Sequence, residues 1–131
     1  MSVGTAVDSA SRVRLAILDD HELLLDTLTS WIDANAPDFE VVLSASTWLQ
    51  LVHSDNFPTD LVFIDFQLKE PVSIEARVRT CRAAGAKVIV ISSFDTPDAR
   101  ERAANAGAVE FLPKTMPIRD VMDAARRVMG I

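Results

Sequence analysis

The sequence predicts an α/β fold, a three-layer sandwich in which helices cover both faces of a parallel, five-stranded sheet. Two observations lead to this prediction. Five short runs rich in apolar and β-branched residues alternate with stretches of helical periodicity, as is typical of successive βα units. Three of these runs are nearly continuous in apolar character, as expected of strands covered on both faces. With 131 residues, 49% of them hydrophobic, the chain can bury the core of one domain.

The strands are expected at the five apolar runs, joined by right-handed crossovers. They are residues 13–18, 40–43, 61–64, 87–91 and 109–112. The first, third and fourth, which contain VRLAIL, LVFI and VIVI, are the nearly continuous ones. Buried strands of this kind belong in the interior of a sheet with helices on both sides.

Helical periodicity marks the segments between the strands. The first helix is expected over 21–35, where Asp20 or His21 can cap the first turn. The fourth is expected over 97–105, because Pro97 suits a first turn and Gly107 suits a helix end. The third should end toward Gly85 and the last should start at Pro117. The expected buried stripes are Leu24, Leu28, Trp31 and Ile32; Trp48, Leu51 and Val52 in a brief second helix; Ile74, Val78 and Cys81; and Ile118, Val121, Met122, Ala125 and Val128.

Composition excludes several classes of function. A net charge of −6 argues against binding to a phosphate backbone, which needs clustered lysine and arginine. The single cysteine, Cys81, cannot form an internal disulfide and is expected to be a small buried hydrophobic residue.

Residues 1–11 have no periodicity and are expected to form a disordered leader. Without a signal peptide or a long apolar run, we expect a cytoplasmic protein with no membrane association.

Polar residues follow the apolar runs where strand ends should meet. Asp19 and Asp20 follow the first run, Asp65 ends the third, Ser92 follows the fourth and Lys114 follows the last. The carboxyl edge of an open parallel sheet is where such folds place their sites. Neighbouring carboxylates repel one another unless a cation neutralises them, and hard oxygen ligands suit Mg²⁺. The sequence therefore predicts a pocket for a phosphoryl group and a divalent metal.

Ordinary structural roles compete with this interpretation. Adjacent aspartates commonly cap a following helix, which explains Asp19 and Asp20 about as well as a metal site does. No helical pattern starts directly after Asp65, so capping explains that residue poorly. Lys114 can be a solvated surface lysine, although its place at a strand end favours the pocket. Ser93 is assigned a loop role.

Four segments, in this order, resemble the receiver domain of two-component response regulators. They are LDDH at 18–21, VFID ending at Asp65, VISSFD at 90–95 and AGAVEFLPK at 106–114, and the resemblance covers nearly all of 12–130. The sequences of the LDDH and SSFD segments are most similar to those of the subfamily whose output domain is a LuxR-type helix-turn-helix domain. The resemblance implies a receiver domain over 12–131 with a flavodoxin-like (βα)₅ fold. It also implies the strand order 2-1-3-4-5, which places the first strand beside the third.

The resemblance also implies a metal site. Asp20 would bind Mg²⁺ directly, and Asp19 largely through water. Asp65 and the backbone carbonyl of Gln67 would be further ligands. Mg²⁺ would be the only cofactor implied.

Phosphoryl transfer and switching are the implied tasks of the remaining residues. Asp65 would be the phosphoacceptor, and Lys114 would contact the phosphoryl group. Ser92 would be the switch hydroxyl and Phe111 the aromatic whose rotamer follows it. On the sequence alone, Phe111 and Val109 can equally point inward as core residues.

The chain departs from the family pattern at three places. The loop after Asp65, FQLKEPVSIE, lacks the usual proline and glycine and carries Lys69, Glu70 and Pro71 instead. Glu110 stands where a small residue usually precedes the aromatic. Thr115 follows Lys114 where many relatives have proline. The first departure bears on the metal geometry, and the other two bear on the output face.

Taken together, these features predict a phosphorylation-dependent switch that is not an enzyme in the usual sense. The phosphoryl group would come from a sensor histidine kinase or a small phosphodonor, and a homodimer is a further candidate assembly. DNA would be reached only through a helix-turn-helix domain absent from this chain. The alternatives are a receiver-like interaction module that works without phosphorylation, a small phosphatase with Asp65 or Asp19 as nucleophile, and a flavodoxin-like cofactor binder. The last fits poorly, because no phosphate-binding loop follows the first strand.

Overall fold

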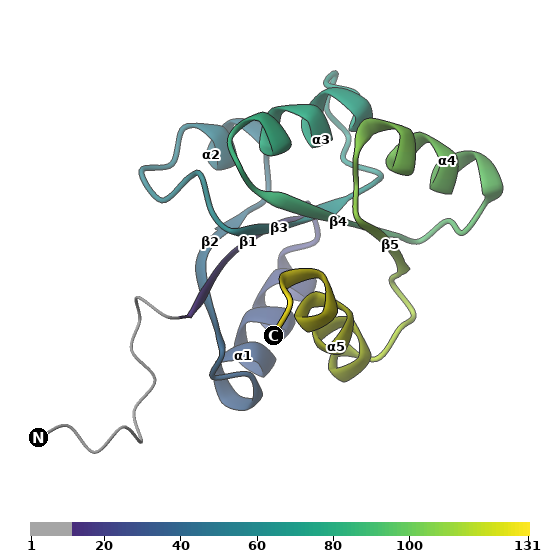
Figure 1. Ribbon diagram of the computed structural model, residues 1–131. Helices are drawn as coiled ribbons and strands as arrows, with labels where there is room; N and C mark the ends of the chain where they lie inside the picture. The colour runs from purple at the N-terminus through teal and green to yellow at the C-terminus, as the bar shows by residue number, and fades with distance from the viewer. Residues whose placement is uncertain (1–11) are drawn as a thin grey trace, which may run out of the picture.

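The computed structural model describes residues 12–131 and confirms the three-layer α/β sandwich (Figure 1). The five strands are parallel and lie in the order β2-β1-β3-β4-β5. The expected leader, 1–11, lies outside the described residues. The elements are β1 Val13–Leu18, α1 Glu22–Asn35, β2 Phe39–Ala45, α2 Trp48–Val52, β3 Leu61–Asp65, α3 Ile74–Ala83, β4 Lys87–Ser92, α4 Pro97–Ala106, β5 Glu110–Pro113 and α5 Ile118–Met129.

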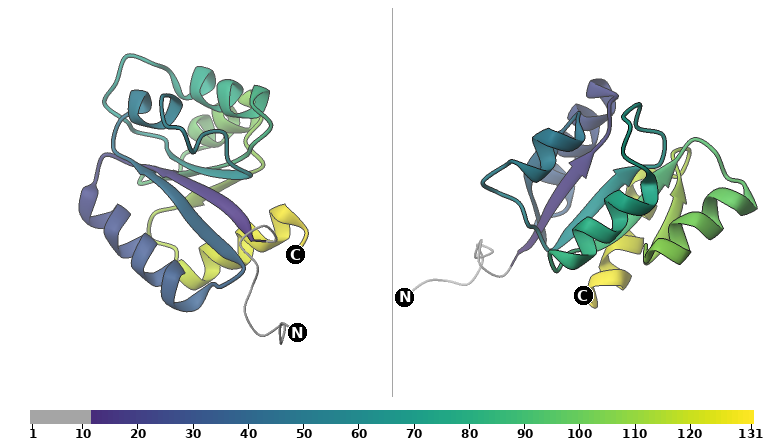
Figure 2. Two further views of the ribbon diagram at one scale, coloured as in Figure 1. Left: turned by 90° about the vertical axis from the view of Figure 1, so that its left-hand side faces the viewer. Right: turned by 90° about the horizontal axis from the view of Figure 1, so that it is seen from above.

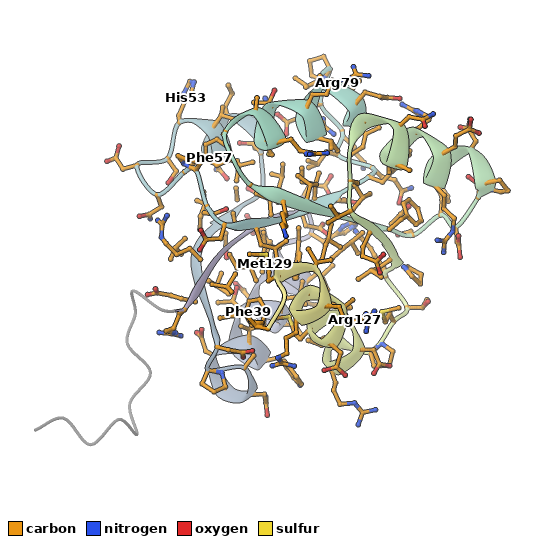
Figure 3. All side chains as sticks on the ribbon, viewed as in Figure 1. Phe39, His53, Phe57, Arg79, Arg127 and Met129 are labelled. Atoms are coloured by element: carbon orange, nitrogen blue, oxygen red, sulfur yellow. The ribbon has the colours of Figure 1, made fainter. Side chains whose placement is uncertain are left out.

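Helices cover both faces of the sheet, with α2, α3 and α4 on one side and α1 and α5 on the other (Figures 1 and 2). The core is accordingly divided into two clusters. Phe39 and Met129 belong to the cluster beside α1 and α5, and Phe57 packs against the other (Figure 3). All five residues of β3 are buried, which agrees with its predicted place inside the sheet.

Element boundaries differ from the prediction at four strands, and β3 and β4 each extend one residue further, to Asp65 and Ser92. β2 is longer than the expected 40–43, and β5 begins one residue later, at Glu110. Val109 precedes β5 and is 42% exposed, so the alternative in which it points inward as a core residue is wrong. Its backbone N–H still donates to the Val88 carbonyl, which extends the pairing of the two strands while the side chain faces water.

Helix starts are fixed by short polar side chains. Thr47, Ser73 and Thr96 accept backbone N–H bonds at the first turns of α2, α3 and α4. His21 holds the corresponding position of α1, but in the described chain neither its side chain nor that of Asp20 caps the helix. The expectation of a cap from these two residues is therefore wrong, which leaves them available to the site.

Helix α3 buries the cysteine as expected. Cys81 is fully buried, and burial raises the pKa of its thiol to about 12. The same helix buries Arg77 beside it, which the sequence pattern did not indicate. Among residues 12–131, the structure contains no helix with the length and apolar character needed to span a membrane.

The strand register aligns the carboxyl ends of the central strands. Leu18 pairs with Ile64, and Asp65 pairs with Ile91. Ser92 in turn pairs with Pro113 on β5. The polar residues that end or follow these strands therefore reach the same edge of the sheet.

Candidate phosphoryl and metal site

Three carboxylates converge at this edge, as predicted. Ligand atoms of Asp19, Asp20, His21 and Asp65 all lie within 4.8 Å of one another. We call the carboxylates of Asp19, Asp20 and Asp65 the acid pocket. Asp19 and Asp20 reach it because β1 lies beside β3, whose last residue is Asp65. Sequence reasoning missed His21 at this site and considered it only as a helix cap.

Histidine 21 borders the acid pocket from its exposed side. Its Nδ1 lies 2.9 Å from Asp19 Oδ1 and 3.3 Å from Asp20 Oδ1. The backbone N–H of His21 donates to Asp19 Oδ1 at 2.9 Å. Its side chain is 67% exposed, so it closes the pocket only partly. The signal for this role was its position directly after the two aspartates at the end of the first strand.

Asp65 is the most enclosed of the three acids. It is 2% exposed, and burial is the main cause that raises the pKa of its carboxyl above the ordinary value. The nearby charge of Asp19 raises this pKa further. A hydrogen bond from the Gln67 backbone and the positive charge of Lys114 act in the opposite direction. Asp65 is thus held as a buried carboxylate in a strongly charged environment.

Lys114 reaches into the acid pocket from the end of β5. Its Nζ lies 2.9 Å from Asp19 Oδ2 and 3.3 Å from Asp65 Oδ2. Its side chain is only 14% exposed, which argues against a freely solvated surface lysine. The shorter contact is to Asp19, so the ammonium group is shared between the two carboxylates.

The acid pocket has the donor set of a hard cation site. Among the described residues, Asp20 Oδ1 and Asp65 Oδ2 are buried oxygens that accept no hydrogen bond. The ammonium of Lys114 is 3.3 Å from Asp65 Oδ2, which is longer than the ~2.7–2.9 Å usual for a charge-assisted bond. Buried anionic oxygens are costly unless paired, and a divalent cation would pair them. The residues present therefore fit Mg²⁺.

The loops beside the acid pocket are joined by Gln67. Its backbone N–H donates to Asp65 Oδ1 at 3.1 Å, while its side-chain oxygen accepts from the Ser93 backbone N–H at 3.2 Å. The loop after β3 is thereby tied to the loop after β4. Ser93 takes part through its backbone, which agrees with the loop role expected for it.

Ser92 lies at the end of β4 and is fully buried. Its Oγ accepts the backbone N–H of Phe94 at 2.9 Å. Accepting this bond leaves the hydroxyl proton free to be donated to another oxygen. The Ser92 carbonyl accepts from the Lys114 backbone N–H at 2.8 Å, so the expected switch hydroxyl and the expected phosphoryl-contacting lysine are held side by side.

Phe111, on β5, lies outside the acid pocket and belongs to an aromatic pair with Phe66, the residue that follows β3. It is half-buried and packs edge-on against Phe66, and the guanidinium of Arg100 lies 4.9 Å from its ring centroid. The structure thus brings Asp19, Asp20, Asp65 and Lys114 together directly. Phe111 is connected to Asp65 only through its contact with Phe66, the residue that follows Asp65.

A largely apolar hollow of about 420 Å³ opens beside the acid pocket. It is lined by His21, Leu23, Leu24, Thr27, Ser93 and Lys114. Leu23, on the first turn of α1, is 81% exposed. The acid pocket is therefore accessible from the side of α1 and the loop after β5.

Comparison with known proteins agrees with the sequence resemblance. Residues 15–126 match the model of the response regulator receiver domain. The chain is 31% identical over 116 residues to the transcriptional regulatory protein LiaR of Bacillus subtilis, covering 87% of this chain and 54% of LiaR. It is 27% identical over 119 residues to DesR, a transcriptional regulatory protein of the same organism, covering 90% of this chain and 59% of DesR. The chain thus spans about half the length of the curated relatives it matches.

Solved structures share the fold. A DNA-binding response regulator of the LuxR family from Staphylococcus aureus superimposes with a TM-score of 0.79, at 18% identity. The match covers 88% of this chain and 98% of that chain. At this level of identity the likeness supports the arrangement of strands and helices and not the roles of individual residues.

Proposed function

The chain belongs to the response regulator receiver domain family, whose members are phosphorylation-dependent switches, and we propose that it accepts its phosphoryl group on Asp65. The observation that carries this proposal is the environment of the Asp65 carboxylate, namely its burial and its contact with Lys114. It is buried at the end of β3, one of its oxygens accepts no hydrogen bond, and Lys114 lies 3.3 Å from that oxygen. A nucleophile and a cation for the incoming group are thus in place together.

The reaction is a transfer of a phosphoryl group to the carboxylate. One Asp65 oxygen forms a bond to phosphorus, while the phosphorus–nitrogen bond of a phosphohistidine breaks and its electron pair returns to the imidazole. Lys114 and the Ser92 hydroxyl hold the equatorial oxygens as charge shifts toward them. With a small donor such as acetyl phosphate, the bond that breaks joins phosphorus to the acetate oxygen. The product is an acyl phosphate on Asp65.

Asp20, Asp65 and the Gln67 carbonyl would hold Mg²⁺, with Asp19 acting through water. When bound, the ion supplies positive charge that offsets the repulsion between the acids and the phosphoryl oxygens. The chain's own contribution is the placement of these groups by β1 and β3. The two buried oxygens described above, which accept no hydrogen bond, support this assignment.

The output of the proposed switch runs through Ser92 and Phe111. Donation from the Ser92 hydroxyl to a phosphoryl oxygen would move the loop after β4, whose next residue, Ser93, is bound to Gln67. A change in that loop alters the packing around Phe111 and the surface formed by α4, β5 and α5. That surface would then change its affinity for a homotypic or heterotypic partner.

The biological setting follows from the family. We propose that the protein is cytoplasmic, that a sensor histidine kinase is the donor, and that the chain has no catalytic task beyond its own phosphorylation and dephosphorylation. Because LiaR and DesR are named as transcriptional regulators, we propose that the switch controls transcription through a helix-turn-helix domain in a longer regulator. A homodimer formed on phosphorylation is the assembly most consistent with that task.

Intact mass spectrometry tests the acceptor. After incubation with acetyl phosphate and Mg²⁺, one phosphoryl mass that is labile to base should appear on the parent protein. Asp65→Asn should remain unlabelled, whereas Asp33→Asn, which changes an exposed acid of α1, should be labelled like the parent. Equal labelling of Asp65→Asn would refute the assignment.

A further inference from the structure

His21 places a ring nitrogen at the edge of the acid pocket. The residue directly precedes α1, and in the described chain its side chain makes no capping hydrogen bond to that helix. Its Nδ1 atom lies 2.9 Å from Asp19 Oδ1 and 3.3 Å from Asp20 Oδ1. An imidazole nitrogen is therefore added to the oxygens from which the proposed Mg²⁺ site is built.

The contacts of Nδ1 require opposite roles of a single atom. Ionised carboxylates only accept hydrogen bonds, so the two aspartates require a proton on Nδ1. The ammonium of Lys114 lies 3.3 Å from the same atom and only donates, so it requires a free lone pair. One ring nitrogen cannot meet both requirements at once. A cation bound by this lone pair and by the carboxylate oxygens would remove the conflict, because Lys114 keeps Asp19 Oδ2 as an acceptor.

The spacing of these atoms suits neighbouring ligands of one metal ion. Donor atoms around an ion with bonds of about 2.0–2.2 Å lie about 2.9–3.5 Å apart. The distances from Nδ1 to the nearest oxygens of Asp19 and Asp20 fall in this range, and ligand atoms of all four residues, with Asp65, lie within 4.8 Å of one another. Among the described residues, Asp20 Oδ1 is buried and accepts no hydrogen bond, so it is available to a cation shared with His21.

An imidazole ligand changes which metal ion a site prefers. Mg²⁺ prefers oxygen ligands, whereas Zn²⁺ accepts imidazole nitrogen together with carboxylate oxygen. The His21 side chain is exposed, and it lines the hollow of about 420 Å³ beside the acid pocket. An ion can therefore reach Nδ1 without displacing core residues.

We propose that His21 Nδ1 is a further metal ligand, which adapts the acid pocket to a divalent ion of the Zn²⁺ type in addition to Mg²⁺. The inference rests on the proposed function, because the same Asp20 and Asp65 carboxylates would hold either ion. Zn²⁺ and Mg²⁺ would compete for one site. Only the binding of Zn²⁺ would depend strongly on the ring.

NMR of the imidazole nitrogens observes the proposed bond directly. The chain has two histidines, and His53, exposed at the end of α2, is an internal control (Figure 3). One equivalent of ZnCl₂, added to the isotope-labelled full chain near neutral pH, should shift the Nδ1 resonance of His21 and leave those of His53 unchanged. Asp20→Asn, which removes one of the proposed oxygen ligands, should require more ZnCl₂ for the same shift.

Calorimetric titrations with ZnCl₂ and MgCl₂ separate the ring from the carboxylates. His21→Gln removes an exposed side chain that caps no helix, so the fold should be retained, and His53→Gln is the matched control. His21→Gln should bind Zn²⁺ at least about tenfold more weakly than the parent, since loss of a residue that only orients a ligand already costs about 10–100-fold. Its affinity for Mg²⁺ should stay within about twofold of the parent's, because Mg²⁺ readily keeps a water in place of a ligand. His53→Gln should match the parent with both ions.

Three results would overturn the inference. An unchanged His21 Nδ1 resonance, or equal Zn²⁺ affinity in the parent and His21→Gln, would exclude the ring as a ligand while leaving the magnesium site intact. Equal losses of Zn²⁺ and Mg²⁺ affinity in His21→Gln would indicate a disturbed acid pocket rather than a lost nitrogen ligand. A parent that binds neither ion would refute the proposed magnesium site and this inference together. Phosphorylation of Asp65 is decided separately, by mass spectrometry.

Discussion

The ring of Phe66 meets the ring of Phe111 edge-on, with centroids 6.2 Å apart and planes inclined at 71°. Phe66 directly follows Asp65, and Phe111 is on β5, so this contact joins the residue next to the acceptor to the aromatic expected to switch. Arg102 lies 5.3 Å from the ring centroid of Phe66 and Arg100 lies 4.9 Å from that of Phe111. Both arginines come from α4. These two cation–π contacts connect α4 to the loop after β3 and to β5.

A double-mutant cycle measures this contact. Phe66→Leu and Phe111→Leu should each lower the free energy of unfolding, and the two effects should be coupled by about 0.5–1.5 kcal/mol, the value for an aromatic pair beyond its buried area. Urea denaturation of the parent, both single variants and the double variant gives the coupling. Additive effects would mean that the two rings only share a hydrophobic environment.

Magnesium should stabilise the fold, because the acid pocket gathers three carboxylates and holds buried carboxylate oxygens that accept no hydrogen bond. At a Mg²⁺ concentration about ten times Kd, the gain should be about 1.4 kcal/mol, seen as a rise in Tm. Asp20→Ala should abolish this rise, and it should raise the Tm of the metal-free protein by relieving repulsion. Asp33→Ala on the outer face of α1 is the control. A full response to Mg²⁺ in Asp20→Ala would place the metal elsewhere.

Acid should weaken the attachment of α3 to α4. Arg102 donates two hydrogen bonds to Glu75, and this contact holds the pKa of the Glu75 carboxyl at about 2. A lowered pKa contributes stability above the ordinary value of 4.5, and this contribution is lost as the pH falls toward about 2. Because both side chains are partly exposed, the pair should contribute only about 0.5–1 kcal/mol.

Urea denaturation across this pH range tests the pair. Glu75→Gln should be less stable than the parent at pH 7, and the difference should vanish near pH 2. Glu101→Gln, at an exposed position of α4, should show no comparable change between these pH values. A difference that is constant across the range would show that the carboxylate charge is not the cause.

The lifetime of the phosphorylated state should depend on Phe94. Hydrolysis requires water opposite the Asp65 oxygen, and Phe94 follows Ser92 by two residues. Phe94 is 56% exposed, so it does not pack into the core, and the Gln67 side chain is engaged by Ser93. If Phe94 shields the phosphoryl group, Phe94→Ala should lose the phosphoryl mass about threefold faster or more, since water access controls the reaction. Leu49→Ala, which removes an exposed apolar side chain from α2, should decay like the parent, whereas an unchanged rate in Phe94→Ala would refute the shielding role.

The sequence by itself determined the sheet and the identity of the pocket acids. Nearly continuous apolar runs identify the interior strands because both of their faces must be covered, and this rule holds without knowledge of neighbours. Asp19, Asp20, Asp65 and Lys114 could be placed at one edge because parallel strands in βα units share their direction. Chain order and local composition carry this information.

Only the tertiary structure decided how these groups pair and which side chains are enclosed. Lys114 divides its charge between Asp19 and Asp65, because distances of about 3 Å between these groups depend on how β1, β3 and β5 are placed in the sheet. The sequence suggests that Arg77 lies on the surface, because its helix is rich in arginine, yet its side chain is buried on α3. The apolar run 109–112 predicts that Val109 is a strand residue, yet its side chain faces water. Burial of a single side chain depends on neighbours distant in sequence, so a local pattern cannot determine it.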